Sequence, residues 1–239
     1  MSDHQASEQM VGYLYQVRYA LALLLDDDNS DSQISIEKFD DVAFVDGNTP
    51  IERIQLKHHV RKAGNLTDKS TDLWRTLKVW LDVVSKSPDI IEGTEFLIIT
   101  TASAPNNTVA FSLRKENRSQ RDADMIDALY EKLKGVCTDS ESQGNKKFYE
   151  AFLAADEKLA KGLINKIYIL DNASNIVDVE KSIRKQVRYS CDRKYEDKVM
   201  ERWEGWWYRK AIEGLCSDTP IFISQDQVRS YIVSTGQEY

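Results

Sequence analysis

The order of hydrophobic and polar positions predicts a chain in which helices alternate with short strands. Apolar residues recur every three or four positions over residues 8–25 and 70–85, as they do on one face of an amphipathic helix. Between these two helices, apolar and polar residues alternate, which is typical of strands with one buried face. The elements expected in this first part are a helix at 8–25, strands at 33–37, 41–45 and 51–59, a helix at 70–85 and a buried strand at 95–101.

The second half continues these patterns, but the composition changes near residue 175. Beyond that point the chain is richer in charged residues and tryptophan. The elements expected here are helices at 119–135 and 144–159, a strand at 166–170, helices at 176–190 and 193–215, an apolar run at 220–224 and a helix from about 225. We therefore expect an α/β domain over 1–175 and a helical partner-docking or oligomerisation region over 176–239. Because the chain ends soon after its last helix begins, the sequence indicates a fragment of a longer protein or a C-terminal docking tail.

Composition excludes several classes of protein. The 239 residues contain no apolar run near the ~18–20 residues that span a bilayer, and the first ten residues do not resemble a signal peptide. We therefore expect a cytoplasmic protein with no membrane partner. The three cysteines form no CxxC pair and are expected to be free thiols. Three histidines are too few for a histidine-rich metal site, and no P-loop, dinucleotide-binding or serine-hydrolase motif occurs.

The net charge of −7 hides an uneven distribution. Residues 26–50 contain eight acids and one base, a balance of −7, whereas residues 52–86 contain eight bases and four acids, a balance of +4. Residues 181–210 contain ten bases and five acids, a balance of +5. Because local potential steers a polyanion, the overall acidity does not exclude DNA or RNA as a partner.

Candidate chemistry lies on the second and third expected strands. Asp41 opens one strand, and the triplet Gln55-Leu56-Lys57 lies in the middle of the next, fourteen positions after Asp41. Side chains alternate along a strand, so Gln55, Lys57 and His59 are expected on one face. An acid on one hairpin strand and a D/E-x-K-like triplet on the other, after one helix and before another, match the restriction-endonuclease-like (PD-(D/E)xK) core. We therefore expect a mixed sheet flanked by helices.

This arrangement suits hydrolysis of a phosphodiester. The reaction needs a divalent cation to polarise the phosphate and acidify a water, and a positive charge near the attacking oxygen. Asp41, the Gln55 amide oxygen and the Leu56 main-chain carbonyl would bind Mg²⁺ or Mn²⁺, because these are oxygen ligands. Lys57 would position or deprotonate the attacking water. The alternative interpretation is a solvated strand face with a surface lysine and glutamine, since a Gln-x-Lys triplet alone is common.

Four sequence blocks resemble the nuclease domain of bacterial anti-phage effectors. They are GYLYQVRYALALLL, IEKFDDVAF, IQLKHH and LTDKSTDLWRTLKVW, and the resemblance covers about residues 10–105. The same domain occurs in the nuclease associated with cyclic-oligonucleotide signalling and in the nuclease subunit of Lamassu-type, or ABC three-component, systems. A fifth block, VMERWEGWWYRKAIEGL followed by PIFISQDQV, resembles the C-terminal region of the Lamassu subunits and favours that branch.

The resemblance implies roles for individual residues. Asp41 matches the acid of the family's DD motif, and Gln55 and Lys57 match its Q-x-K motif. Glu37 matches an upstream acid that holds a second metal or orients the first. Gln16 matches the glutamine of the YQ motif on the first helix and would contact the site from there.

Several basic residues near the motif are candidates for DNA contact. His59 shares the expected face of Lys57, and Arg61, Lys62 and Lys69 follow the motif along the chain. Such charges are more often solvated surface than phosphate ligands. Farther along, Trp203, Trp206 and Trp207 share one helix face, which predicts core packing or, alternatively, a subunit interface.

We therefore expect a Mg²⁺-dependent double-stranded DNA endonuclease that acts as a defence effector. The resemblance implies that an SMC-like ABC ATPase and a small third subunit are its partners. It also implies that release from the ATPase yields an active homo-oligomer, a dimer or tetramer. The alternative is a non-catalytic subunit of the same complex that binds DNA or partners. A third option is a nuclease for RNA or single-stranded DNA with the same site.

Overall fold

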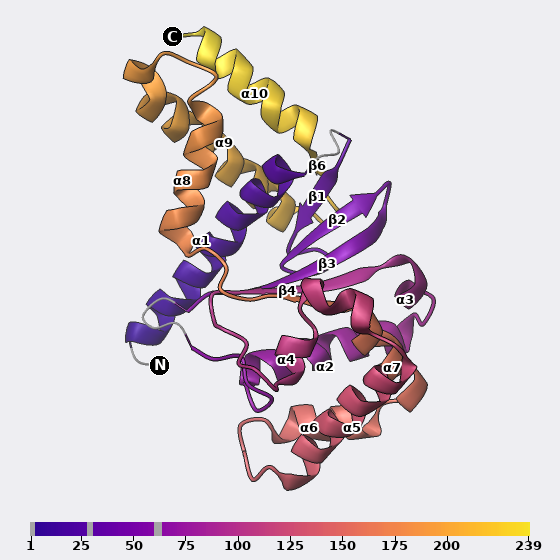
Figure 1. Cartoon of the computed structure of the whole chain (residues 1–239). Helices are drawn as coiled ribbons and strands as arrows, with labels where there is room; N and C mark the ends of the chain where they lie inside the picture. Colours follow the sequence, from indigo (N-terminus) through magenta and orange to yellow (C-terminus); the bar gives the residue numbers. More distant parts are fainter. Residues whose placement is uncertain (1–2, 28–30, 60–63) are drawn as a thin grey trace. The chain divides into compact units, whose positions relative to one another are not determined.

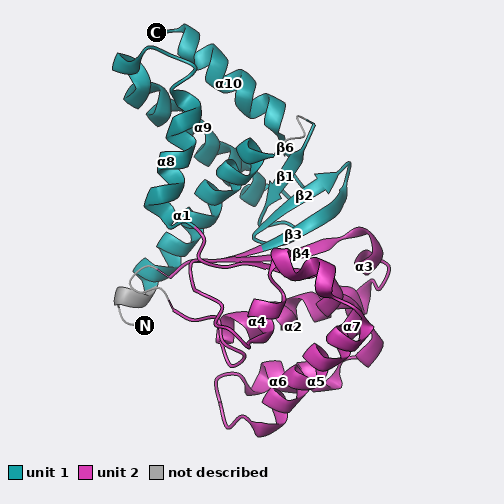
Figure 2. Cartoon of the chain, in the orientation of Figure 1, with its two compact units in different colours: residues 1–54, 174–239 teal, residues 55–173 magenta. Residues whose placement is uncertain are grey.

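The computed structural model describes residues 3–27, 31–59 and 64–239, with residues 3–5 described in their backbone only. The chain forms two compact units, one of residues 1–54 and 174–239 and one of residues 55–173 (Figures 1 and 2). We call them unit 1 and unit 2. Among the described residues, no helix is both long enough and apolar enough to cross a bilayer.

Unit 1 combines the two ends of the chain. Its four strands are antiparallel neighbours in the order β3-β2-β1-β6. Helix α1 packs on β1 and on the three C-terminal helices. The elements of unit 1 are α1 (Asp3–Asp26), β1 (Gln33–Ile36), β2 (Val42–Asp46), β3 (Thr49–Lys57, which passes into unit 2 after Ile54), α8 (Ile176–Val187), the 3-10 helix η2 (Arg193–Tyr195), α9 (Glu196–Cys216), β6 (Ile223–Ser224) and α10 (Gln225–Gln237).

The hairpin of unit 1 is set by a two-residue turn. Asp46 pairs with Thr49, so Gly47 and Asn48 form the loop between β2 and β3. Gly47 has a φ of 58°, a left-handed conformation that glycine adopts at little cost. The register then places Val42 opposite Ile54 and Ala43 opposite Arg53. The turn and both strands confirm the pattern seen in the sequence.

Unit 2 is built from one continuous stretch of chain. Strands β4 and β5 are parallel, with Phe96 beside Ile167, and the last residues of β3 lie next to β4. Helices α2, α5, α6 and α7 enclose a large apolar core that contains Trp74 and Trp80, both fully buried. Besides the end of β3, the elements of unit 2 are α2 (Thr71–Lys86), α3 (Ile90–Gly93), β4 (Glu95–Thr100), α4 (Val109–Ser112), the 3-10 helix η1 (Lys115–Gln120), α5 (Ala123–Asp139), α6 (Lys146–Ala154), α7 (Glu157–Lys166) and β5 (Ile167–Leu170).

Most predicted elements are confirmed within a few residues, but the helix expected over 144–159 is wrong. It is two helices, α6 and α7, which are separated at Ala155 and Asp156. The Asp156 side chain accepts a hydrogen bond from the Leu159 main-chain N–H at 2.9 Å and so begins a new helix. Apolar spacing continues across the break, which is why the pattern did not reveal it.

The chain returns to unit 1 at Ser174. The Asn175 side chain caps α8 by accepting hydrogen bonds from Val177 and Asp178. The helices that follow pack with the N-terminal elements rather than as a body of their own. Trp203 and Trp207 are buried in this unit and Trp206 stacks on Tyr231, so these three side chains serve internal packing.

Candidate functional site

Residues 37–41 join β1 to β2 in unit 1, and we call them the acidic loop. The Glu37 main-chain N–H donates a hydrogen bond to the Asp41 carbonyl at 3.0 Å, which closes the loop. Glu37 has a φ of 57°, a left-handed conformation that costs a non-glycine residue roughly 1–3 kcal/mol. Such strain persists only where surrounding structure imposes it, and it is concentrated at functional sites. The loop therefore holds two predicted site residues in a defined backbone geometry.

A buried arginine, Arg53, supports the acidic loop. It is 6% exposed, lies opposite Ala43 in the hairpin and donates a 2.5 Å hydrogen bond to the Phe39 carbonyl. Burial lowers the pKa of Arg53, and the negative charge of Asp40 partly offsets that shift. Asp40 is buried and accepts a hydrogen bond from the Asp41 main-chain N–H at 3.3 Å. Asp40 thus serves the loop's structure, whereas Asp41 is half-buried at the start of β2.

Helix α1 adds a tyrosine that the sequence analysis missed. Gln16, the predicted contributor, is half-buried on α1. Tyr13 lies one turn earlier on the same helix face, and its hydroxyl is buried without a hydrogen-bond partner among the described residues. Burial raises the pKa of Tyr13, and the charge of Glu37 raises it further. Its spacing from Gln16 was the signal that could have identified it.

The Gln-x-Lys triplet lies at the end of β3, in unit 2. The Lys57 ammonium donates a 2.5 Å hydrogen bond to the Gln55 amide oxygen. The two side chains therefore share one face of the strand, as the alternation predicts. Gln55 is 8% exposed, Leu56 is buried, and Lys57 is half-buried. Such a partly desolvated lysine, hydrogen-bonded to an amide oxygen, is a charge held in place rather than a freely rotating surface group.

The candidate DNA contacts have different surroundings. Strand β3 ends at Lys57, so the alternation no longer fixes the side of His59. The His59 imidazole lies 3.1 Å from the Asp72 carboxylate, and its main-chain N–H donates to the Thr101 hydroxyl at 2.9 Å. Lys69 is exposed in the turn before α2. Arg61 and Lys62 lie outside the described residues.

The structure brings the predicted residues together in two groups. Glu37 and Asp41 close one loop in unit 1, and Gln55 and Lys57 form a hydrogen-bonded pair in unit 2. The division between the units falls between Ile54 and Gln55. No three His, Cys, Asp or Glu side chains cluster as a metal site within the described parts of the chain. The predicted ligand set is of another kind, because it combines one carboxylate with an amide and a main-chain carbonyl.

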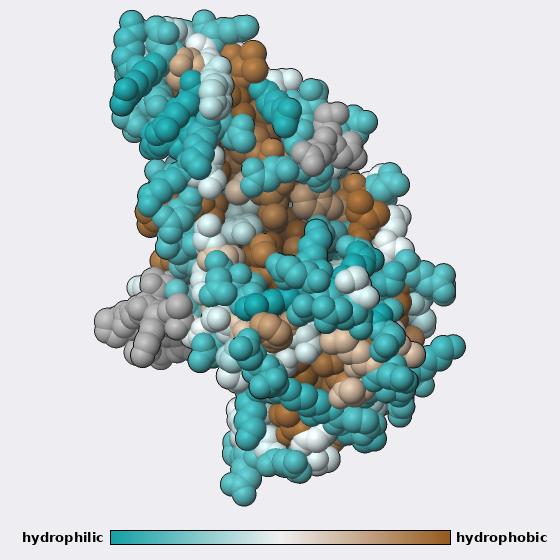
Figure 3. Space-filling model, viewed as in Figure 1, coloured by the Kyte–Doolittle hydropathy of each residue, from teal (hydrophilic) through white to brown (hydrophobic). Residues whose placement is uncertain are grey.

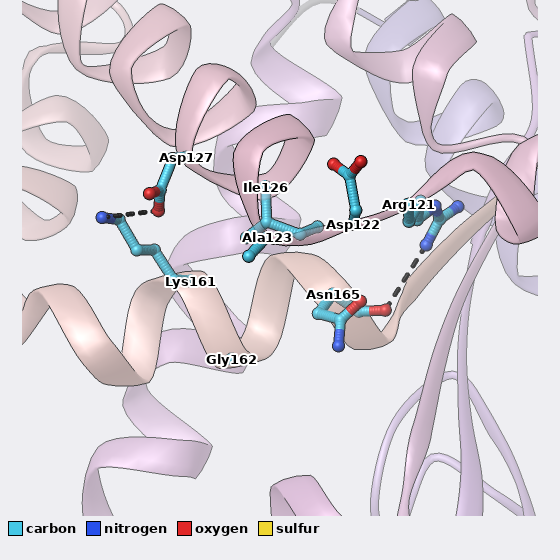
Figure 4. A pocket seen from close by; sticks show the side chains of 8 residues that line it. All are labelled: Arg121, Asp122, Ala123, Ile126, Asp127, Lys161, Gly162 and Asn165. Atoms are coloured by element: carbon cyan, nitrogen blue, oxygen red, sulfur yellow. Dashed lines mark hydrogen bonds and ion pairs between the residues drawn. The ribbon is translucent and has the colours of Figure 1, made fainter.

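Unit 2 also has a hollow of about 390 Å³ between the start of α5 and α7, where Asp127 points toward Lys161 (Figure 4). Its charged side chains already have partners. Lys161 pairs with Asp127 at 2.8 Å, and the Asp122 carboxylate caps α5 by accepting from the Met125 N–H. Arg121 donates hydrogen bonds to four main-chain carbonyls. The hollow therefore offers structural contacts rather than groups poised for chemistry.

Comparison with known proteins gives a structural relationship and no sequence relationship. No protein-family model matches the chain, and no curated protein matches it. In structure it is similar to the Cap4 SAVED/CARF-domain containing receptor of Moraxella osloensis, with a TM-score of 0.54 and 15% sequence identity. The match covers 95% of this chain and 48% of that one, so this chain spans about half the length of the receptor. The chain thus has a mixed α/β fold, shared with part of that receptor, in which a six-stranded sheet is flanked by helices and the C-terminal region is helical.

Proposed function

We propose that this chain is a metal-dependent endonuclease that cleaves double-stranded DNA as an effector of bacterial anti-phage defence. The observation that carries the proposal is the hydrogen bond between Lys57 and Gln55 at the end of β3. That bond keeps a lysine and an amide oxygen side by side, as water activation next to a metal requires. The same strand forms a hairpin with β2, which begins directly after Asp41.

The hairpin register supports a restriction-endonuclease-like arrangement. Val42 lies opposite Ile54. Asp41 directly precedes Val42, and Gln55 directly follows Ile54. The strained Glu37 and the buried Arg53 give the acidic loop a fixed shape before any ligand binds. Preorganisation of this kind lowers the cost of placing a charged ligand.

The donor set fits a hard divalent cation. Asp41 would supply a carboxylate, Gln55 an amide oxygen and Leu56 its main-chain carbonyl, and Mg²⁺ prefers such oxygen ligands. The Gln55 amide oxygen is a neutral ligand, and it also accepts the hydrogen bond from Lys57. When bound, the cation would polarise the phosphate and acidify a water. Lys57 would hold that water and offset the negative charge that develops on the phosphate.

The proposed defence role draws on the sequence and on the fold. The four N-terminal blocks resemble the anti-phage nuclease domain, and the fold is shared with the Cap4 SAVED/CARF-domain containing receptor. The C-terminal block favours the Lamassu branch, with an SMC-like ATPase as the inhibiting partner. Control by assembly is part of the proposal, because an unregulated DNA endonuclease would damage its host.

The test is a cleavage assay with the purified chain. Supercoiled and linear plasmid, single-stranded DNA and RNA are incubated with Mg²⁺ or Mn²⁺, or with EDTA. We expect metal-dependent cleavage of duplex DNA, and a loss of about 10²-fold or more in Lys57→Ala and in Asp41→Asn. Two matched variants control for the change of charge: Lys86→Ala at the exposed end of α2 and Asp46→Asn at the other end of β2. Both are expected to cleave like the unmodified chain.

The assay also separates the alternatives. DNA binding without cleavage, both for the chain alone and with the ATPase partner and DNA ends, would contradict the proposal and identify a non-catalytic subunit. Cleavage confined to RNA or single-stranded DNA would keep the site and correct the substrate.

A further inference from the structure

The turn between α8 and α9 in unit 1 presents a concentrated positive charge and an exposed aromatic ring. We call Lys185, Arg188, Tyr189, Arg193 and Lys194 the basic corner. All five are exposed, and residues 185–194 contain these four bases against one acid, Asp192. The last turn of α8 lies at one end of unit 1. The side chains in view at that end are largely hydrophilic (Figure 3). The proposed catalytic residues lie on other elements.

Helix electrostatics explains only part of this charge. Cations in the last turn of a helix are favoured by the negative end of its dipole, which accounts for Lys185 in α8. Arg193 and Lys194 lie beyond that helix, in η2. Lys185, Arg193 and Lys194 make no ion pair with any described residue. These three positive charges are therefore available to a partner.

Two acids that follow the corner along the chain, Glu196 and Asp197, are paired with arginines. Glu196 lies 3.2 Å from Arg188 and 3.8 Å from Arg184, and Asp197 lies 2.6 Å from Arg184. Arg188, Arg193 and Glu196 line a hollow of about 420 Å³. A ligand there meets two guanidinium groups and one carboxylate, which is paired with Arg188, so one net positive charge remains and the hollow favours an anion.

Tyr189 is exposed although the backbone around it is held in place. Its side chain is 93% exposed, the highest fraction among the large hydrophobic and aromatic residues described. The next residue, Ser190, donates hydrogen bonds to the Val187 carbonyl from its N–H at 2.9 Å and its hydroxyl at 2.7 Å. Gly236 of α10 packs on the Ser190 backbone so closely that an added Cβ would lie 2.0 Å from the Ser190 carbonyl oxygen. The turn thus presents the ring on a fixed support.

We infer that the basic corner binds the sugar–phosphate backbone of DNA, with Tyr189 stacking on an unpaired base. Guanidinium and ammonium groups bind phosphates, and exposed aromatic rings bind unstacked bases with little dependence on sequence. The choice of DNA over an acidic protein segment rests on the proposed function. The corner gives the chain an anchoring surface for DNA in addition to the candidate catalytic residues.

The test measures DNA binding in EDTA, where metal-dependent cleavage cannot occur. Fluorescence anisotropy of the full chain is recorded with a labelled duplex and with the corresponding single strand, at several salt concentrations. Arg193→Glu/Lys194→Glu is compared with Lys115→Glu/Lys158→Glu, which changes the charge equally at exposed lysines of η1 and α7. We expect the first variant to bind both probes about tenfold or more weakly than the second. For the first variant, the slope of log binding constant against log salt concentration should also be smaller in magnitude by about two.

Tyr189→Ala provides the second arm. We expect it to weaken binding of the single strand by about tenfold and of the duplex by less, because stacking needs an unpaired base. All substituted side chains are exposed, so the thermal midpoints should match that of the unmodified chain. Equal DNA affinity of the two double variants would overturn the inference. If that result were combined with corner-dependent binding of polyglutamate, the partner would be an acidic protein.

The outcome is independent of the cleavage assay. Binding that depends on the corner, in a chain that never cleaves, would reject only the proposed function. If the chain cleaves DNA but its DNA affinity is unchanged in the corner variants, only this inference would be rejected.

Discussion

The two units differ in how the chain builds them. Unit 2 comes from one stretch of chain and is organised around a continuous apolar core. Unit 1 joins segments from both ends of the chain through side-chain bonds to distant backbone. Trp207 donates to the Val17 carbonyl, 190 residues away, and Gln225 donates to the Leu24 carbonyl, 201 residues away. Burial of apolar surface is non-directional, whereas these hydrogen bonds require one specific geometry.

The continuous apolar core of unit 2 predicts that its stability depends most on core volume. Trp74→Ala removes a fully buried side chain that meets Tyr149 and Phe152 edge-on. We expect the free energy of unfolding to fall by about 3–5 kcal/mol, because a large cavity remains. Denaturant unfolding followed by circular dichroism measures the change. Val79→Ala, at a half-exposed position of the same helix, should cost far less, and a loss below about 1 kcal/mol for Trp74→Ala would contradict the account.

Unit 1 should instead be sensitive to the close approach of α10 to the turn after α8. Gly236→Ala would place a methyl group 2.0 Å from a backbone oxygen, where no side chain can move aside. We expect a loss of about 3 kcal/mol in the same unfolding experiment. Gly205→Ala in α9 is the matched control, since its Cβ would meet nothing within 4 Å. That change should stabilise the chain by about 0.5–1 kcal/mol, and equal effects of the two variants would refute the comparison.

A buried amide should contribute a smaller, directional effect in unit 1. Gln225 is fully buried, and its amide nitrogen donates to the Leu24 and Asp27 carbonyls at 2.7 and 2.6 Å. Gln225→Leu leaves both carbonyls near the end of α1 without this donor, so we expect a loss of about 1–2 kcal/mol. Gln237→Leu, at an exposed position of α10, should change stability by less than about 0.5 kcal/mol. Equal stability of the two variants would show that these bonds do not secure unit 1.

The smallest expected effect is a difference in thiol reactivity between the units. Cys137 is buried in unit 2, and burial raises its pKa to about 12, so its thiol stays protonated at pH 8. Cys216 is exposed in unit 1. Because the thiolate is the reactive form, iodoacetamide at pH 8 should label Cys216 rapidly and Cys137 only after unfolding. Mass spectrometry of the labelled chain gives the order, and rapid labelling of Cys137 in the native state would contradict the buried core.

The sequence predicted local structure well where a local pattern determines it. The turn at Gly47 and the shared face of Gln55 and Lys57 both depend on residues a few positions apart. It missed the break at Asp156, because one capping side chain ended a helix whose apolar spacing continued. The joining of residues 1–54 with 174–239 was not predicted either, because it depends on bonds such as that from Trp207 to Val17.

The candidate site shows the same limit. Asp41, Gln55 and Lys57 were identifiable because strand alternation and motif spacing are visible in the sequence. Arg53 and Tyr13 were not identified, although Arg53 donates to the Phe39 carbonyl of the acidic loop. A buried arginine in a strand has no distinctive sequence signal, and Tyr13 is marked only by its spacing from Gln16. Their positions depend on how elements far apart in the chain pack.

The most direct test of the central claim is a comparison of plasmid cleavage rates for Asp41→Asn, Lys57→Ala and the double variant. Residues that serve one reaction act as a unit, so their losses do not multiply. We predict a loss of about 10²-fold or more for each single variant and little further loss in the double variant. Single variants that cleave as fast as Lys86→Ala, or losses that multiply in the double variant, would contradict a shared role for Asp41 and Lys57.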